Sequence, residues 1–224
     1  MINILPYGNN ALLINFEQKI DAKIHNLVKG YFNSISEFEE VSYQIPAYCS
    51  VMVVFDPVTT NFKKLKSKIE KLNIKPDEIK SDSKIIEIPV CYELEFAPDL
   101  ASLAKEINLS SEEIISLHTS KTYDVYMMGF LPGFPYLGEL PEGLECKRKA
   151  TPRKQVKAGS VGIAGKQTGI YPTDAPGGWQ LIGQTPLKIF DAAKENAFLI
   201  KLGDKIKFKS ISAQTFKTLQ KNGK

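Results

Sequence analysis

The sequence predicts an α+β domain of ferredoxin-like order followed by an all-β domain, a barrel or a sandwich. Over roughly the first 84 residues, the apolar residues follow a helical period in some stretches and a strand period in others. Beyond that point, eleven of the fifteen glycines lie between residues 126 and 185, among short strand patterns and tight turns. A chain of 224 residues is long enough for two such domains.

The first part of the chain supplies the elements of the α+β domain. We predict two helices, at residues 21–35 and 60–72, and four strands, at residues 11–16, 41–45, 50–55 and 84–90. Asp21 stands near the N-cap of the first helix. The order strand, helix, strand, strand, helix, strand is that of a ferredoxin-like unit. The charged stretch 75–83 indicates a joint, and we assign residues 1–84 to the first domain and 85–224 to the second.

The second domain begins with two short helices, at residues 98–107 and 110–118. Ser110 and Glu113 have the spacing of a capping box at the start of the second of these helices. An alternating strand follows at residues 123–128. Short strand patterns then recur about every ten residues, at 160–165, 169–172, 179–183, 187–191, 198–202 and 205–209, and a terminal helix is predicted at 212–221.

Composition argues against several classes of function. The formal net charge is only +4, and the lysines are interspersed with acids, so nucleic acid is not an expected partner. Cys49, Cys91 and Cys146 are odd in number and far apart, and with two histidines they predict neither a disulfide framework nor a metal site. We find no signal peptide, no membrane-spanning run, no phosphate-binding loop and no nucleophile elbow, so we expect a cytoplasmic protein without its own nucleotide loop.

Arginine is the rarest charged residue of the chain. There are 27 lysines but only Arg148 and Arg153, both in a stretch, residues 146–173, that holds seven basic residues and no acid. Arginine offers a planar fork that binds a carboxylate or phosphate through two bonds, so we favour anion recognition over chance. The basic stretch itself suits a small anionic ligand or an acidic partner surface, although a solvated face remains an alternative.

Several polar and aromatic residues share the Gly- and Pro-rich segment with the arginines. Glycine turns expose backbone amides that can bind an oxyanion, and Ser160, Gln167 and Tyr171 lie close by in sequence, although the same glycines also allow close strand packing. Tyr136 is held on a rigid turn. Trp179 follows Pro176, Gly177 and Gly178, where it is either a ligand platform or a core residue. His118 ends a predicted helix as a general base or as a residue that the helix dipole favours.

These segments together resemble the 5-oxoprolinase B-subunit family. The resemblance rests on LHTSKTYDVYMMGFLPGFPYLGELP at 117–141, RKATPRKQVKAGSVGIAGKQTGIYPTDAPGGWQLIGQTP at 148–186 and GDKIKF at 203–208. The family is also known as allophanate hydrolase subunit 1 and as a sporulation kinase inhibitor, and it is similar to half of the carboxyltransferase domain of urea carboxylase. Lys157 departs from the family pattern, which has a proline there.

The resemblance implies a cyclophilin-like barrel as the second domain and a hydrolase subunit that is inactive alone. It implies that an A and a C subunit assist, that the homologous C subunit pairs barrel to barrel with this chain, and that the complex opens 5-oxoproline to glutamate with ATP as cosubstrate, bound mainly by a partner. As catalytic residues it implies His118, Arg153 and Gln167. As substrate-binding residues it implies Tyr136, Arg148, Ser160, Tyr171, Pro176, Gly177, Gly178 and Trp179.

Two other functions stay open at this point. One is a regulatory protein that inhibits a histidine kinase by direct binding, for which an exposed apolar contact patch would be needed. The other is a component of an allophanate or urea amide hydrolase, or of a carboxyltransferase. Carboxyl transfer would need biotin and carboxylase domains, which this sequence lacks.

Overall fold

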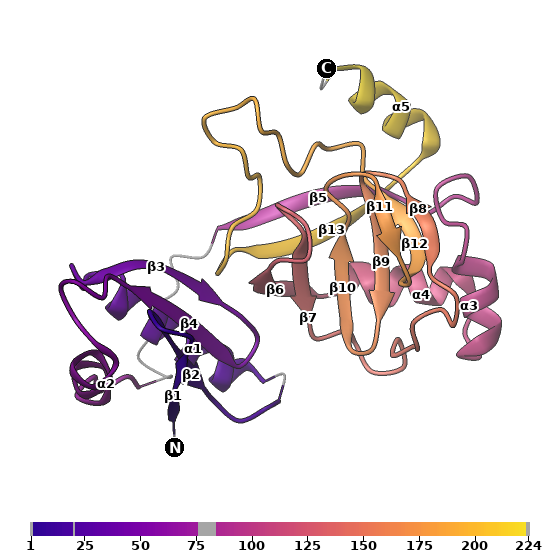
Figure 1. Ribbon diagram of the computed structural model, residues 1–224. Coiled ribbons are helices and arrows are strands. Elements are labelled where there is room, and N and C mark those ends of the chain that lie inside the picture. The colour runs from indigo at the N-terminus through magenta and orange to yellow at the C-terminus, as the bar shows by residue number, and fades with distance from the viewer. Residues whose placement is uncertain (1, 20, 76–83, 223–224) are drawn as a thin grey trace. The chain divides into compact units, whose positions relative to one another are not determined.

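The computed structural model describes residues 2–19, 21–75 and 84–222 (Figure 1). The chain divides into two compact units, Met1–Asp82 and Ser83–Lys224. Each unit has its own cluster of buried apolar residues. The predicted joint at 75–83 lies, apart from residue 75, outside the described residues.

The first unit is a four-stranded antiparallel sheet with two helices. Its strands are β1 (Asn3–Tyr7), β2 (Ala11–Asn15), β3 (Val41–Pro46) and β4 (Ser50–Phe55), in the spatial order β1-β2-β4-β3. The helices α1 (Ala22–Ile35) and α2 (Phe62–Glu70) contribute to a single core with the sheet. Asp21 is the N-cap of α1, as predicted, and its carboxylate accepts hydrogen bonds from two backbone N–H groups of the first turn.

The predicted fold class, a ferredoxin-like domain followed by a cyclophilin-like barrel, is wrong. The described residues form mostly β-structure, with a seven-stranded barrel and five short helices. Along the chain, the elements of the first unit have the order strand, strand, helix, strand, strand, helix. Strand β1 escaped prediction because Pro6 interrupts its pattern, and an edge strand tolerates proline. The strand predicted at 84–90 lies instead in the second unit, as β5 (Ile85–Cys91).

The second unit contains the closed barrel. Around it the strands run β10 (Gln167–Ile170), β7 (Pro135–Gly138), β6 (Thr122–Met128), β13 (Lys205–Ile211), β5, β12 (Gln180–Gln184) and β9 (Ser160–Ala164), which pairs with β10 again. Strands β5 and β13 are parallel, and the other barrel pairs are antiparallel. Strands β8 (Arg153–Val156) and β11 (Ala175–Gly177) form a separate two-stranded sheet.

Three helices accompany the barrel: α3 (Leu100–Glu106), α4 (Ser111–Ser120) and α5 (Ala213–Asn222). The predicted capping box of α4 is confirmed, because Ser110 and Glu113 exchange both of its hydrogen bonds. The strands predicted at 187–191 and 198–202 are wrong: apart from one isolated bridge between Phe190 and Phe198, these segments are irregular. The two phenylalanines instead pack ring on ring, with centroids 5.2 Å apart.

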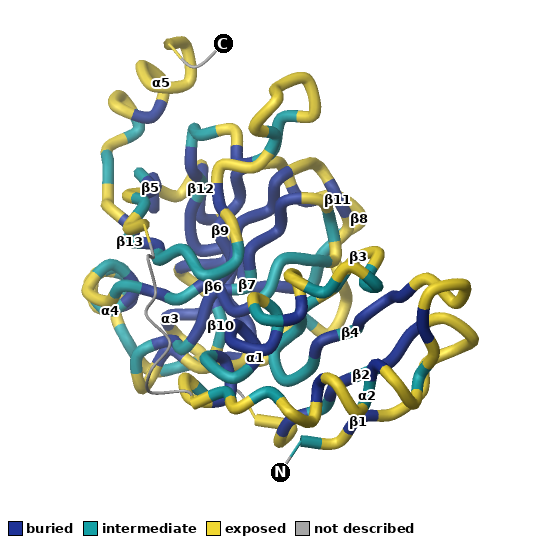
Figure 2. The backbone as a smooth tube through the Cα atoms, turned by 90° about the vertical axis from the view of Figure 1, so that its left-hand side faces the viewer, coloured by how far each residue is buried: buried dark blue, intermediate teal, exposed yellow. Residues whose placement is uncertain are grey.

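The barrel interior is filled by apolar side chains. Figure 2 shows buried backbone along β9, β10 and β12, and all five residues of β9 are buried. This continuous burial is expected of a strand enclosed on both sides. Across the described residues, no helix is both long and apolar enough to pass through a membrane.

Candidate functional site

A cavity of about 330 Å³ opens among the loops at one end of β7 and β10. Five aromatic side chains line it, together with Arg148, two glycines, two prolines and a leucine, and we call it the aromatic pocket. The aromatic residues are Phe130, Phe134, Tyr136, Tyr171 and Trp179, and the others are Leu131, Pro152, Pro176, Gly177 and Gly178. A volume of this size is that of a small-molecule site.

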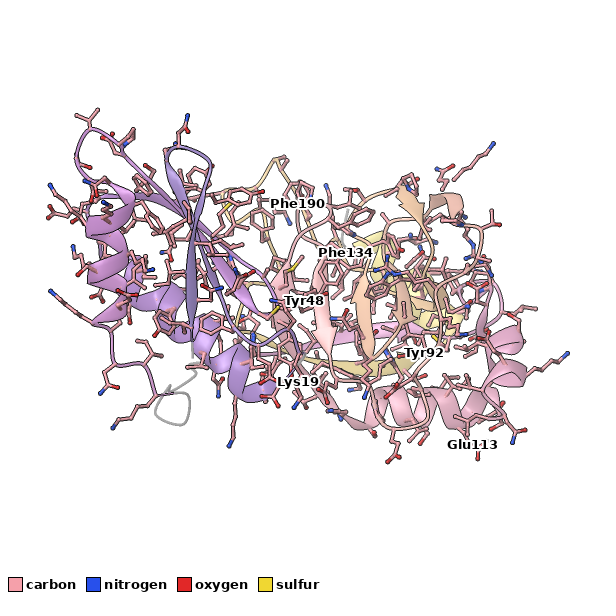
Figure 3. The ribbon with its side chains drawn as sticks, turned by 60° about the horizontal axis from the view of Figure 1, so that its bottom comes forward. Lys19, Tyr48, Tyr92, Glu113, Phe134 and Phe190 are labelled. Carbon is pink, nitrogen blue, oxygen red and sulfur yellow. The ribbon has the colours of Figure 1, made fainter. Side chains whose placement is uncertain are left out.

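Phe134, which Figure 3 labels, holds the aromatic cluster together. Its ring centroid lies 4.8 Å from that of Tyr136, 5.1 Å from that of Tyr171 and 5.5 Å from that of Trp179. The contacts with Tyr171 and Trp179 are edge-to-face, a favoured geometry for aromatic pairs. Because Phe134 and Trp179 are almost fully buried, the cluster is a rigid wall.

Glycine is required at position 177 by the close approach of a tyrosine. A Cβ atom at Gly177 would lie 2.2 Å from the Tyr171 hydroxyl, far inside contact distance. A Cβ at Gly178 would meet nothing nearer than a Pro152 carbon at 3.6 Å, an ordinary contact. The first glycine of the PGGW segment therefore makes room for Tyr171 to line the pocket.

Arg148 supplies the charge of the aromatic pocket. No ion pair joins it to a carboxylate of the described residues, so its fork is available to a ligand. Burial raises the pKa of Tyr136 and of Tyr171, and the nearby Arg148 charge only partly offsets this. Both phenols are therefore protonated at neutral pH. The arrangement favours a small ligand that combines a negative charge with a flat apolar body.

Arg153 is directed to a different partner, Asp99, at the start of α3. Its Nη2 donates to Oδ1 of Asp99, and Lys149 Nζ donates to the same oxygen over 3.1 Å. The other carboxylate oxygen accepts from the backbone N–H of Leu181 in β12 over 2.7 Å. The side chain of Asp99 is 4% exposed. Its hydrogen bonds link the start of α3 to β8, to β12 and to the loop that carries Arg148. In this structure Arg153 lies outside the pocket lining.

The charge of Asp99 is stable because its cationic partners outweigh its burial. Burial by itself would raise the pKa of Asp99, but hydrogen bonds from Arg153, the Leu181 N–H and Lys149 bring it below its usual 3.8. The neighbouring backbone N–H of Lys149 also donates to the carbonyl of Gly178 over 2.7 Å. The loop that carries Arg148 is therefore fastened at the next residue, Lys149, through both its side chain and its backbone.

His118 lies inside the unit and is fully buried. Thr168 donates to the carbonyl of Gly162 over 3.1 Å, so its oxygen is free to accept from Nε2 of His118 at 2.9 Å. Nδ1 is then the acceptor for the Tyr92 hydroxyl at 2.8 Å. The ring also stacks on Phe208, with centroids 4.4 Å apart. Every polar atom of the imidazole is satisfied in its neutral form, and these contacts fit a structural role.

Acidification is expected to expose this role of His118. Burial lowers the pKa of His118 to about 3 in the folded chain, against 6.5 ordinarily. Below pH 6.5 the unfolded chain takes up a proton that the folded chain refuses, so stability falls as the pH drops from 6.5 towards 3. Between pH 7 and pH 5 we expect a loss of about 2 kcal/mol in the free energy of unfolding. Urea unfolding at a series of pH values measures it.

The control is the His118→Gln variant, measured over the same pH range. It should start from a lower stability at pH 7, because the Tyr92 and Thr168 hydroxyls lose their partner, and it should lack the slope between pH 6.5 and 5. An equal slope of stability against pH in both proteins would show that His118 takes up its proton in the folded chain as readily as in the unfolded chain. A solvent-accessible general base would behave in that way.

Two further predicted site residues are absent from the pocket lining. Gln167 begins β10, whereas Tyr171 follows its last residue; at about 3.3 Å per residue these two positions are roughly 13 Å apart. Ser160 is buried at the start of β9, where its backbone pairs with that of Tyr171. The structure thus brings together Tyr136, Arg148, Tyr171 and the segment from Pro176 to Trp179, and leaves out His118, Arg153, Gln167 and Ser160.

Some residues of the pocket were not anticipated as site residues. Phe134, Leu131 and Pro152 lie in the Gly- and Pro-rich segment, and only their neighbourhood could have indicated them. Phe130 is 62% exposed at the pocket and has a left-handed backbone with φ of 67°. A non-glycine residue in this region is a known mark of functional loops. Asp99 carries no local signal in the sequence.

The described residues hold no group of three or more His, Cys, Asp and Glu side chains with the spacing of a metal site. The aromatic pocket is built from aromatic, cationic and backbone groups. The polar side-chain groups of its lining residues are the guanidinium of Arg148, the hydroxyls of Tyr136 and Tyr171 and the indole N–H of Trp179.

Comparisons with known proteins agree on one family. Residues 2–200 match the family model for the carboxyltransferase domain, subdomain C and D. The chain is 40% identical to the 5-oxoprolinase B subunit of Bacillus subtilis (strain 168), over 93% of this chain and 92% of that protein. It is also 25% identical to the urea amidolyase of Lachancea kluyveri, over 94% of this chain but only 13% of that protein.

The solved structure of TTHA0988 has the same fold. It superposes with a TM-score of 0.81 at 29% identity, covering 92% of this chain and 40% of that chain. The chain thus spans less than half of that protein. Together with the family model, this match relates the fold to the carboxyltransferase domain rather than to a ferredoxin-like domain joined to a barrel.

Proposed function

Because the chain belongs to the 5-oxoprolinase B-subunit family, we propose that it is one subunit of an ATP-dependent enzyme that hydrolyses 5-oxoproline to glutamate. The name of the relatives implies further subunits, and we propose that homologues of the A and C subunits complete the enzyme. In this proposal the C subunit pairs with the barrel, and the isolated chain has no activity.

The observation that carries the proposal is Arg148 beside the aromatic cluster. 5-Oxoproline is a small, flat lactam ring that carries one carboxylate. A planar fork suits the carboxylate, and the wall formed by Phe134, Tyr171 and Trp179 suits the ring. The pocket volume of about 330 Å³ is sufficient for a molecule of this size.

A second observation supports an anionic ligand at this place. Nη1 of Arg153 is buried and has no hydrogen-bond partner among the described residues, although Nη2 is bonded to Asp99. The charge of Arg153 also acts on the phenol of Tyr171, which lines the pocket. An anion at the pocket rim would satisfy this nitrogen, and Arg153 would then assist Arg148 as a secondary contact.

The division of labour follows from the chemistry of a lactam. A lactam amide resists water, so we propose that a phosphoryl group from ATP is transferred to the lactam oxygen, after which water adds to that carbon. The C–N bond then breaks and the nitrogen takes a proton, which leaves an acyl phosphate. A second water releases phosphate from it, and the products are glutamate, ADP and phosphate. This chain's residues bind and orient the carboxylate and the ring, and ATP is proposed to bind mainly to a partner subunit.

The test is glutamate release by the reconstituted complex. The chain would be purified together with its A-subunit and C-subunit homologues, supplied with 5-oxoproline and ATP, and assayed with each protein omitted in turn. We expect release that requires this chain, at a turnover within the ordinary range of roughly 1–1,000 per second. ADP production and glutamate release should be equal in amount.

Two negative outcomes are distinct from each other. An intact complex that hydrolyses allophanate or another small amide, but not 5-oxoproline, would move the assignment towards the urea amidolyase relatives. An intact complex without turnover of either kind would favour regulation of a histidine kinase by direct binding. The exposed Phe130 would then be the first position to replace.

A further inference from the structure

A second cavity lies at the carboxyl ends of the parallel strands β5 and β13. Its volume is about 600 Å³, and it is bounded by α3, the start of α4 and the segment that leads from β13 into α5. It shares no lining residue with the aromatic pocket. In Figure 3, Tyr92 of this cavity and Phe134 of the aromatic pocket lie at different places on the unit. We call it the acidic groove.

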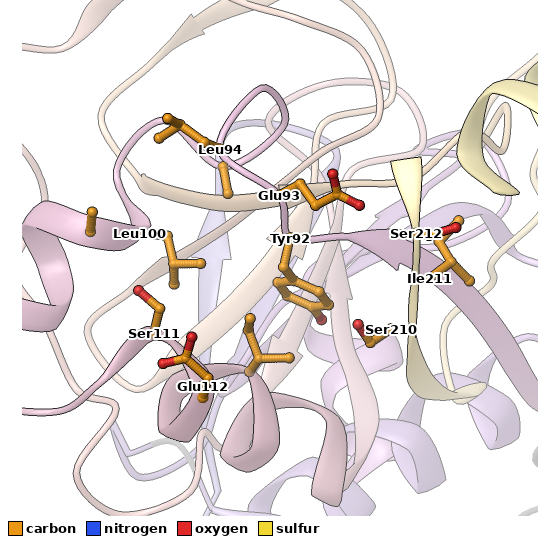
Figure 4. Close-up of a pocket in the computed structure, with 12 residues that line it drawn as sticks. Tyr92, Glu93, Leu94, Leu100, Ser111, Glu112, Ser210, Ile211 and Ser212 are labelled. Atoms are coloured by element: carbon orange, nitrogen blue, oxygen red, sulfur yellow. The ribbon is translucent and has the colours of Figure 1, made fainter. Parts of the chain in front are cut away.

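The floor of the acidic groove is apolar. Figure 4 shows the ring of Tyr92 in the middle of the groove, and the hydroxyl of this residue donates to Nδ1 of His118 in the interior. The ring of Tyr92 therefore lines the groove, whereas its hydroxyl is engaged in the hydrogen bond with His118. Leu100, Ile115 and Ile211 add apolar walls, and Leu94 stands over one side, 77% exposed. These residues line one cavity together, and a contiguous apolar surface with polar residues at its rim is typical of a ligand-binding groove.

The charges of the groove are of one sign. Two carboxylates, Glu93 and Glu112, belong to its lining, together with the hydroxyls of three serines, and among the described residues the lining contains no lysine, arginine or histidine. Glu93 is held in place, because one of its oxygens accepts from the backbone N–H of Ala213 over 2.7 Å. Glu112 makes no ion pair with the described residues.

Two lysines near the groove, on β13 and on α5, are paired with carboxylates. Lys217 lies 3.6 Å from Glu95, and Lys209 lies 4.0 Å from Glu87. The start of α4 also faces the groove, and its positive dipole end is occupied by its own capping box, in which Glu113 accepts from the backbone and side chain of Ser110. What the groove offers a ligand is therefore an apolar floor with two carboxylates at its edge.

We propose that the acidic groove binds a small organic cation, an alkylammonium compound. Its hydrocarbon chain would lie against Leu94, Leu100 and Tyr92, and its charge would lie between Glu93 and Glu112. This site is independent of the proposed hydrolase function, because neither its residues nor its ligand class belongs to the aromatic pocket.

The experiment is calorimetric titration of the full-length chain with three probes of equal chain length: hexylammonium, hexyltrimethylammonium and hexanoate. We expect saturable binding of at least one ammonium probe and at least roughly tenfold weaker binding of hexanoate, because the carboxylates repel it. Similar binding of hexanoate would overturn the proposal, as would the absence of saturable ammonium binding at millimolar concentration.

Two variants and one control test the location. Glu112→Gln should weaken ammonium binding roughly fivefold, the size expected for one partly exposed charge pair. The double variant Glu93→Gln with Glu112→Gln should remove the preference for ammonium over hexanoate. Glu106→Gln, on the neighbouring α3 and outside the groove lining, should change nothing. Glu93, Glu112 and Glu106 are exposed, so the variants should unfold at the temperature of the parent protein. Unchanged binding in the double variant would refute the assigned site.

Discussion

Replacing Arg148 with methionine is expected to lower kcat/KM of the assembled complex for 5-oxoproline by at least about a hundredfold. Arg148 is the only cation among the described residues that line the aromatic pocket, and a forked, charge-assisted contact to a carboxylate is among the stronger protein hydrogen bonds. A hundredfold loss corresponds to about 2.7 kcal/mol of transition-state stabilisation, a size that such a contact supplies. Methionine keeps most of the length of the side chain and its apolar packing.

Steady-state kinetics of three further variants separates charge from geometry. Arg148→Lys keeps the charge without the fork and should recover only part of the activity. Lys147→Met removes the neighbouring exposed cation, which is absent from the pocket lining, and should leave kcat/KM within about twofold, the range of a rim charge. If Arg148→Met retained full activity in an intact complex, the aromatic pocket would not hold the carboxylate. If Lys147→Met were equally damaging, the field of the whole basic loop would be responsible.

Composition located the region of the candidate site because rare residues are informative. Arg148, Trp179 and the paired glycines have few functional equivalents in a lysine-rich chain, and the structure gathers them with Tyr136 and Tyr171 in one cavity. The direction of each side chain could not be read in the same way. Arg153 lies five positions after Arg148 yet is bound to Asp99, whose position 54 residues earlier has no counterpart in any local pattern.

Gln167 lies outside the pocket because of its distance along the strand, and His118 lies outside it because it is enclosed in the interior. A strand pattern tells which residues share a face, but it does not tell at which end of the strand a ligand arrives, so it could not separate Gln167 from Tyr171. His118 is the last apolar-face position of α4, and a helical period cannot distinguish the inside of a barrel from its mouth. Both limits are tertiary, because they depend on which segments meet.

The prediction of the fold class failed for the same reason, because it also depends on which distant segments meet. The pattern at 85–91 identified a strand, but periodicity carries no information on the sheet to which a strand belongs. Its partners, β13 and β12, are found more than 90 residues later, and the parallel pairing with β13 runs through all seven residues of β5. Local order therefore suggested a ferredoxin-like unit, whereas long-range pairing placed the strand in the barrel.

Replacing Asp99 with alanine is expected to lower the free energy of unfolding by about 3–5 kcal/mol, the cost of breaking a buried ion pair by removing one partner. The variant leaves Arg153 and the Leu181 N–H without their acceptor, and Arg153 already has one buried nitrogen without a partner among the described residues. Because Asp99 fastens the segments around the aromatic pocket, the damage should also reach the pocket. Denaturant unfolding at pH 7 measures the first effect.

Trp179 provides the second measurement, because it is the only tryptophan of the chain and lies in the wall of the pocket, 5% exposed. In folded Asp99→Ala its emission should move to longer wavelength and its quenching by acrylamide should increase. Asp124→Ala is the matched control: it breaks a half-exposed pair with Lys205, 3.0 Å apart, and should cost no more than about 1 kcal/mol without any change in Trp179 emission. Equal losses of stability in both variants would mean that Asp99 behaves as an ordinary surface ion pair and does not organise the pocket.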